Sequence, residues 1–95
     1  MTMAEMPGDE RPRERLQRLG AAALKDSELL AILLRTGQKG RSAVSLAEQL
    51  LQVYEGSLVR LAEAEVGELA RLAGMGPVKA IGLKAAFSLA RRLSE

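Results

Sequence analysis

The chain has 95 residues, of which 47% are hydrophobic and only 2% aromatic, and its formal net charge is +2. It is long enough for one domain with a modest core, which Leu and Ala must fill. Because it contains neither Cys nor His, the sequence excludes disulfides, thiol chemistry, His-ligated zinc and any reaction that needs an imidazole. We find no apolar run long enough to span a bilayer and no signal pattern, so we expect a soluble, cytoplasmic protein without a membrane partner.

Charge is distributed in blocks along the chain. Residues 11–41 hold eight basic and three acidic side chains, and residues 77–95 hold four and one. Acidic groups outnumber basic ones in residues 1–10 and 42–76. Both basic blocks flank glycine-containing turns, which suits contact with a polyanion. A chance alternation on a solvated surface explains the pattern equally well.

The amino-terminal segment is predicted to lack regular structure. Residues 1–10 show no periodicity, so we expect a disordered lead-in followed by a single helical domain over residues 11–95. Pro12 suits the first turn of a short helix that carries several arginines and ends at Gly20. That helix is more typical of a solvated or partner-facing element than of a DNA site.

The next predicted helix, residues 26–36, is the most apolar part of the chain. Its apolar residues are too dense for a one-sided stripe, which indicates a core helix buried on most of its circumference. Asp26 fits the N-cap, and Gly37 fits the terminator. In the polar turn that follows, Lys39 and Arg41 fit clamps on a phosphate backbone or, equally, solvated side chains.

The remaining apolar spacing predicts three further helical segments and no strand. Ser42 can cap a helix that runs to about Tyr54. A short connector of one or two turns follows, and then come a helix over residues 64–73 and a last helix over residues 77–93. In the last helix Val78, Ile81, Ala85, Leu89 and Leu93 share one face, with Lys84, Arg91 and Arg92 left for solvent.

The turn between the last two helices, LAGMGPVKA at residues 72–80, is the most informative motif. Gly74 stands where the first helix needs a left-handed terminating residue, and Gly76 lets the backbone approach a ligand. Pro77 suits the first helical position. The free amides beyond it, the helix dipole and the side chain of Lys79 together favour an anion at this end of the helix.

Two other glycine motifs are excluded by spacing. The position five before Gly40 is Arg35, so the P-loop glycine is missing. The third glycine of a dinucleotide fingerprint would fall at Lys79, and the segment before Gly74 has a helical rather than a strand period. Neither a nucleotide cofactor nor any other cofactor is therefore expected.

The segment from Leu69 to Leu83 resembles the helix-hairpin-helix motif in its hydrophobic-Gly-hydrophobic-Gly turn. The resemblance implies that Met75 plugs the helix pair and that Ala80 allows the helices to approach closely. It also implies that the amides of residues such as Gly76, Val78 and Lys79 contact phosphates. The alternative is a hairpin that serves packing alone.

A second resemblance covers nearly all of the predicted domain. The segments RPRERL at residues 11–16 and DSELLAILLRTG at residues 26–37, together with the last hairpin, resemble the amino-terminal domain of RadC-type proteins, which is similar to RuvA domain 2. Such proteins join this domain to a JAMM metallopeptidase-like domain with a His-x-His metal motif. This chain has no histidine, so we expect no metal site and no enzyme activity within it.

The chain departs from the RadC pattern at two helix starts. The family commonly places Ser or Thr where this chain has Lys25, so the cap is expected to shift to Asp26 or to be lost, at a cost of about 1 kcal/mol. The cap before the hairpin is similarly replaced by Glu65.

Taken together, the residues predict an all-α fold of five to six short helices that form two packed hairpins, the second a helix-hairpin-helix at residues 65–93. The expected core comprises Ile32, Leu33, Leu50, Leu69, Leu72, Ile81 and Leu89. The favoured function is binding of duplex or branched DNA without base readout, as in a DNA-repair protein. The predicted phosphate contacts are Gly74, Gly76, Val78, Lys79, Lys84, Lys39 and Arg41. The alternative is a protein-interaction or linker module that positions a JAMM-type catalytic domain or another protein partner.

Overall fold

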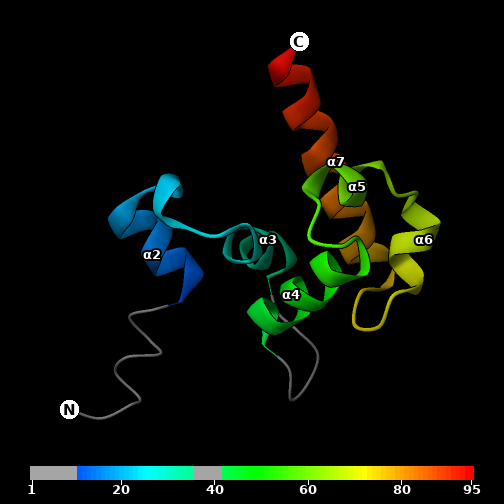
Figure 1. Cartoon of the computed structure of the whole chain (residues 1–95), viewed down its shortest axis with the longest axis horizontal. Coiled ribbons are helices and arrows are strands. Elements are labelled where there is room, and N and C mark those ends of the chain that lie inside the picture. Colours follow the sequence, from blue (N-terminus) through cyan, green and yellow to red (C-terminus); the bar gives the residue numbers. More distant parts are fainter. Residues whose placement is uncertain (1–10, 36–41) are drawn as a thin grey trace.

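The computed structural model describes residues 11–35 and 42–95, and this part of the chain contains helices and no strand (Figure 1). The predicted all-α class is confirmed, whereas the predicted lead-in at residues 1–10 lies outside the described residues. In chain order the elements are α2 (Pro12–Leu19), the 3₁₀ helix η1 (Ala21–Ala23), α3 (Asp26–Leu34), α4 (Ala43–Val53), α5 (Leu58–Glu63), α6 (Val66–Arg71) and α7 (Gly76–Ser94).

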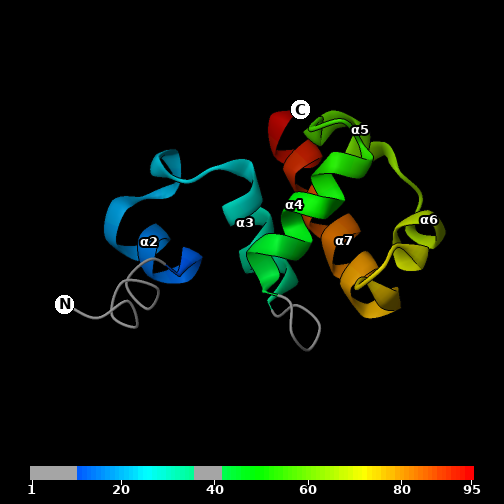
Figure 2. The same ribbon diagram turned by 60° about the horizontal axis from the view of Figure 1, so that its bottom comes forward.

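The helices pair as the two predicted hairpins. Helix α3 packs mainly against α4, and α6 packs mainly against α7, while α7 also touches α3 and so joins the two pairs (Figure 2). Helix α2 lies at one end of the molecule and contacts α3 and η1 (Figure 1). The described part of the chain is thus a pair of hairpins with a small amino-terminal extension.

A single hydrophobic core runs through both hairpins. Leu46, Leu61, Leu69 and Leu83 are its largest fully buried side chains, and they come from four different helices. With only two aromatic residues in the chain, leucine and alanine fill this space. The complete set of buried core residues is Leu30, Ala31, Leu34, Leu46, Ala47, Leu50, Tyr54, Leu61, Ala64, Leu69, Met75, Ala80 and Leu83.

Part of the predicted core is wrong. Leu50 and Leu69 are buried as expected, and Ile32 and Leu72 are half-buried. In contrast, Leu33, Ile81 and Leu89 are 50%, 59% and 63% exposed. These residues lie on α3 and α7, and each of these helices has more apolar residues than one face can hold. Packing against neighbouring helices buries one face of each, and this selection is not contained in the apolar spacing.

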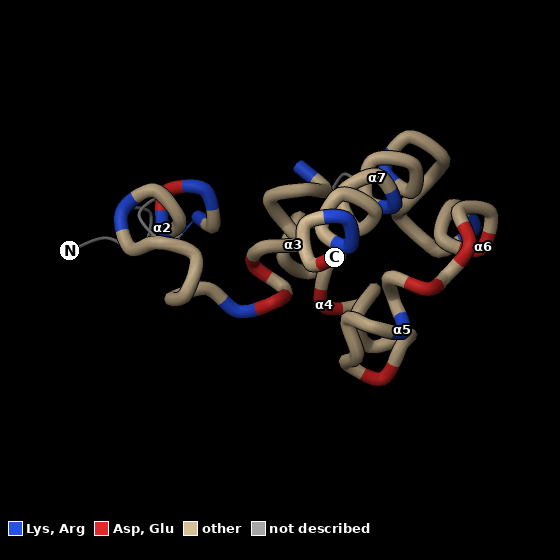
Figure 3. Tube along the Cα trace, turned by 90° about the horizontal axis from the view of Figure 1, so that it is seen from above, with Lys and Arg blue, Asp and Glu red and all other residues tan. Residues whose placement is uncertain are grey.

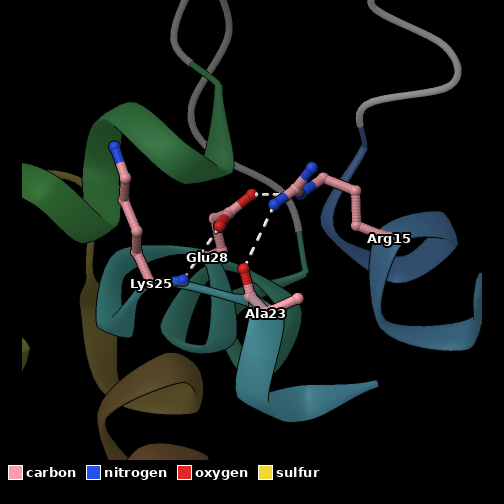
Figure 4. Close-up of polar contacts among 4 residues, drawn as sticks. All are labelled: Arg15, Ala23, Lys25 and Glu28. Atoms are coloured by element: carbon pink, nitrogen blue, oxygen red, sulfur yellow. Dashed lines mark hydrogen bonds and ion pairs between the residues drawn. The ribbon is translucent and has the colours of Figure 1, made fainter. Parts of the chain in front are cut away.

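The side-chain cap at the start of α3 is lost, which is the second of the two predicted outcomes. Lys25, not Asp26, is the N-cap, and its amide donates to Glu28 Oε1 at 2.9 Å (Figure 4). Glu28 Oε2 also lies 2.8 Å from Nε of Arg15, which in turn donates from a second nitrogen to the carbonyl of Ala23 at 3.2 Å. Glu28 therefore closes the start of α3 and attaches α2 to it, although Lys25 offers no side-chain oxygen.

Helix α3 ends earlier than predicted. Its last residue is Leu34, and Arg35 takes a positive φ of 72° as the C-cap. The predicted terminator Gly37 lies outside the described residues. At the start of α6, Glu65 makes no side-chain capping bond, so the expected loss of that cap is confirmed.

The phenol of Tyr54 fastens the end of α4 to α6. Its Oη donates a hydrogen bond to Glu68 Oε2 at 2.7 Å, and the side chain is buried. Burial raises the pKa of Tyr54 to about 12, and the hydrogen bond to Glu68 and the charge of that carboxylate act in the same direction. The folded protein therefore holds the phenol in its neutral form.

We predict that this contact makes stability fall in strong base. Because the pKa of Tyr54 is higher in the folded state than in the unfolded chain, its contribution is complete below pH 10 and is lost as the pH rises toward 12. The free energy of unfolding should decrease by on the order of 2 kcal/mol across that interval. Urea denaturation of the parent and of Tyr54→Phe measures it. Lysines also lose their protons in this pH range, but they do so in both proteins. An equal decrease of the free energy of unfolding with pH in the parent and in Tyr54→Phe would therefore contradict the prediction.

Candidate functional site

The turn between α6 and α7 has the geometry that its glycines predicted. Gly74 and Gly76 have φ values of 85° and 72°, in the left-handed region that disfavours side chains. Between them, Met75 is only 4% exposed, and its amide donates to the carbonyl of Leu72 at 3.0 Å. The predicted plug between the two helices is confirmed. Ala80, one turn into α7, is fully buried against the core.

The amino end of α7 presents backbone donors. Gly76 and Val78 are the first and third residues of α7, so their amides have no acceptor within the helix, and no backbone hydrogen bond outside helices in the described segments uses them. Pro77 stands in the first turn and has no amide hydrogen. The first N–H groups of an α-helix lack intrahelical acceptors, and the dipole of this 19-residue helix adds partial positive charge at the same end.

An open hollow of about 680 Å³ lies beside this helix end. The end of α3 forms one wall, and the turn and first residues of α7 form the other. Arg35 is exposed and Lys79 is partly exposed, so the hollow combines two cations with apolar side chains. The lining residues are Leu33, Leu34, Arg35, Met75, Gly76, Pro77, Val78, Lys79 and Gly82.

The structure brings together only some of the predicted site residues. Gly76, Val78 and Lys79 line the hollow, and Gly74 belongs to the adjoining turn. The expectation that Lys84 is free for solvent is wrong, because its Nζ lies 2.5 Å from the carbonyl oxygen of Ala62. It thereby attaches α7 to the end of α5.

Three further cations belong to the segment around the end of α3: the predicted Lys39 and Arg41, and Arg35, which was not predicted. Lys39 and Arg41 lie outside the described residues. Arg35 was not among the predicted phosphate contacts, although it belongs to the motif at residues 26–37. Its position at the end of an apolar helix was visible in the sequence, but its place beside the turn of the other hairpin depends on the packing of α3 against α7.

Charges are unevenly arranged over the described residues. Lys and Arg mark α2 and α7, whereas α5, α6 and their connection carry the acidic residues Glu63, Glu65 and Glu68 (Figure 3). Within its bounds α7 carries four basic residues and no acidic one. The hollow therefore opens at the amino end of the most basic helix of the second hairpin, where a negatively charged group is favoured.

The described segments show neither a metal centre nor a membrane span. No group of three or more His, Cys, Asp or Glu in residues 11–35 and 42–95 could hold a metal ion. In the same residues no helix combines the length and apolarity needed to cross a bilayer.

Comparison with known proteins gives one family. The model described as "UPF0758 N-terminal" matches residues 3–81. A "UPF0758 protein" of Trichlorobacter lovleyi is 51% identical over 90 residues, covering 93% of this chain and 39% of the relative. A "UPF0758 protein" of Dechloromonas aromatica is 54% identical over 92 residues, which cover 97% of this chain and 41% of the relative. One of Neisseria gonorrhoeae is 50% identical over 95 residues, which cover 100% of this chain and 42% of the relative. This chain thus spans about two fifths of the length of these relatives. No solved structure matches it.

We predict opposite effects of alanine at two glycines of α7. Gly76→Ala should lower the free energy of unfolding by about 1–2 kcal/mol, because φ is 72° there even though a Cβ would meet no atom. Gly82→Ala is the matched control. A Cβ at Gly82 would also meet no atom, but this position lies in regular helix, where alanine loses less conformational entropy on folding than glycine. Gly82→Ala should therefore raise the free energy of unfolding by about 0.5–1 kcal/mol. Chemical denaturation of both variants tests this. A neutral effect at Gly76 would contradict the turn geometry.

Proposed function

This chain belongs to the UPF0758 N-terminal family, and from the geometry of its last hairpin we propose that it binds the phosphate backbone of DNA. The observation that carries the proposal is the amino end of α7, where the amides of Gly76 and Val78, which have no acceptor within the helix, lie beside a hollow that also contains Arg35 and Lys79. Backbone amides at a helix end bind phosphate oxygens without reading bases. The proposed contact is therefore independent of sequence.

The proposed phosphate contacts are narrower than the set predicted from the sequence. The amides of Gly76 and Val78 would hold one phosphate, with the side chain of Lys79 as a mobile cation beside it. The amide of Lys79, in contrast, has the Met75 carbonyl as its acceptor within the helix. Arg35, on the opposite wall, would contact the same or an adjacent phosphate. We leave Lys84 out of this group, since its ammonium already donates to Ala62.

The choice of duplex or branched DNA over single strands follows from the aromatic residues. Proteins that bind single strands stack bases on exposed aromatic rings. The chain has one Tyr and one Phe. Tyr54 is buried and bonded to Glu68, and Phe87 packs against the core. Neither ring is available as a stacking platform, which supports recognition of the duplex backbone.

The proposal can be tested by comparing substitutions at Lys79 and at Lys84, the other lysine of α7. In mobility-shift titrations over a salt series, the parent should lose affinity steeply, with a log–log slope of about −0.9 for each phosphate neutralised. Lys79→Gln should weaken binding and make the slope shallower by about 0.9. Lys84→Gln removes the same charge from α7, but it should leave the slope unchanged because that ammonium is engaged at Ala62.

Parallel titrations of duplex, branched and single-stranded DNA of equal length complete the design. Circular dichroism confirms that each variant is folded. If Lys79→Gln retards duplex DNA as the parent does, or if affinity is insensitive to salt, the proposal is overturned and the hairpin serves packing alone. Equal changes of slope for both variants would indicate a general charge effect rather than a site at the end of α7.

A further inference from the structure

Helix α7 has two apolar faces, and the described residues cover only one of them. Ala80 and Leu83 are buried, and Phe87 is half-buried on the same side. The face predicted to be buried is instead exposed. It consists of Val78, Ile81, Ala85, Leu89 and Leu93, which we call the α7 stripe.

The α7 stripe is long and continuous. Its members are three or four residues apart, so they form one row along the helix. Val78 and Leu93, at its two ends, are 83% and 87% exposed. Leu33 of α3 lines the same hollow as Val78 and extends the row onto a second helix. A solvated helix face is normally polar, and a contiguous apolar patch of this kind marks a contact surface.

The carboxy-terminal turns of α7 stand clear of the other helices (Figure 1). Every residue from Ser88 to Glu95 is exposed. Leu89 and Leu93 therefore have free space around them on a helix that is itself unsupported over its last two turns. A partner can reach this part of the stripe without displacing any described residue.

A second copy of the chain is a poor occupant because of charge. Lys79 lies near one end of the stripe and Arg92 lies beside it at the other, and α7 has no acidic residue within its bounds. Antiparallel pairing of two α7 helices would bring the arginines of each to the positively charged amino end of the other. Parallel pairing would oppose the arginines to each other. An apolar surface edged with Asp or Glu is complementary to the stripe.

In the longer relatives, further polypeptide is covalently joined to the region that this chain matches, and we consider it as the occupant of the stripe. The family model describes an amino-terminal region, and the chain spans only 39–42% of the relatives it matches. The match to the Neisseria gonorrhoeae protein covers the whole of this chain, so the further sequence in that relative follows α7. A tethered segment meets a neighbouring surface at high effective concentration.

We infer that the α7 stripe is the docking surface for the polypeptide that follows α7 in the longer UPF0758 relatives, through apolar contacts edged by acidic side chains. The interface fixes the hairpin against the remainder of such a protein. Its two ends differ in this respect: Val78 also lines the hollow of the proposed phosphate site, whereas Leu89 and Leu93 lie at the opposite end of the helix. The inference does not depend on DNA binding.

Cysteine labelling tests the inference directly, since this chain contains no cysteine. Leu89→Cys is made in the 95-residue chain and in a hybrid in which this chain replaces the matching region of the Dechloromonas aromatica relative. Maleimide labelling at that site is followed by peptide mass spectrometry. It should be at least tenfold slower in the hybrid. Val59→Cys, at a position that is 67% exposed on α5, is the matched control and should label equally in both.

A charge reversal tests the acidic edge. In the hybrid, Arg92→Glu, three residues from Leu89 and therefore on the same side of α7, should speed the labelling of Leu89→Cys several-fold, whereas Arg71→Glu on α6 should leave it unchanged. Equal labelling of Leu89→Cys in the chain and the hybrid would overturn the inference. Labelling of the 95-residue chain that slows with protein concentration would overturn it in favour of a second copy. The Dechloromonas aromatica protein itself, with Cys at the aligned position, is a second host should the hybrid not fold. No DNA is present, so the outcome is independent of the phosphate site.

Discussion

The close approach of α6 and α7 is the constraint on which the rest of this structure depends. Ala80 has no exposed surface, and Leu69 of α6 and Leu83 of α7 are buried in the same core cluster. Only a small side chain at Ala80 allows two helices to come this near, and only positive φ values at Gly74 and Gly76 turn the chain tightly enough to bring them there. Met75 fills the remaining space. Together these contacts set the rotation of α7 about its own axis.

That rotation decides what each surface of α7 can do. With Ala80 and Leu83 facing inward, Lys79 lies at the mouth of the hollow, opposite the exposed end of α3. Lys84 turns toward the end of α5 and is held at the carbonyl of Ala62. Two lysines on one helix thus have different roles, since one remains near a helix end suited to anions and the other closes a contact between elements.

The two surfaces that remain open on α7 differ in chemistry. The amino end offers amides and cations to a phosphate, as we propose for DNA. The α7 stripe offers aliphatic side chains bordered by basic residues, which suits an acidic protein surface. An apolar face on an exposed helix is usually covered by a neighbouring surface. We propose that the polypeptide following α7 in the longer relatives is that covering.

From the amino-acid sequence alone, the helical class, the two hairpins, the glycine turn with Met75 inside it and the absence of His and Cys chemistry could all be established. These features follow from local rules: apolar spacing, backbone freedom at glycine and residue inventory. The burial of Leu33, Ile81 and Leu89 could not be judged in this way, nor could the capture of Lys84 or the nearness of Arg35 to the turn. The periodicity of α7 fits two opposite faces, and only packing against α3 and α6 selects one. That selection rests on contacts between residues far apart in the chain, which no local pattern records.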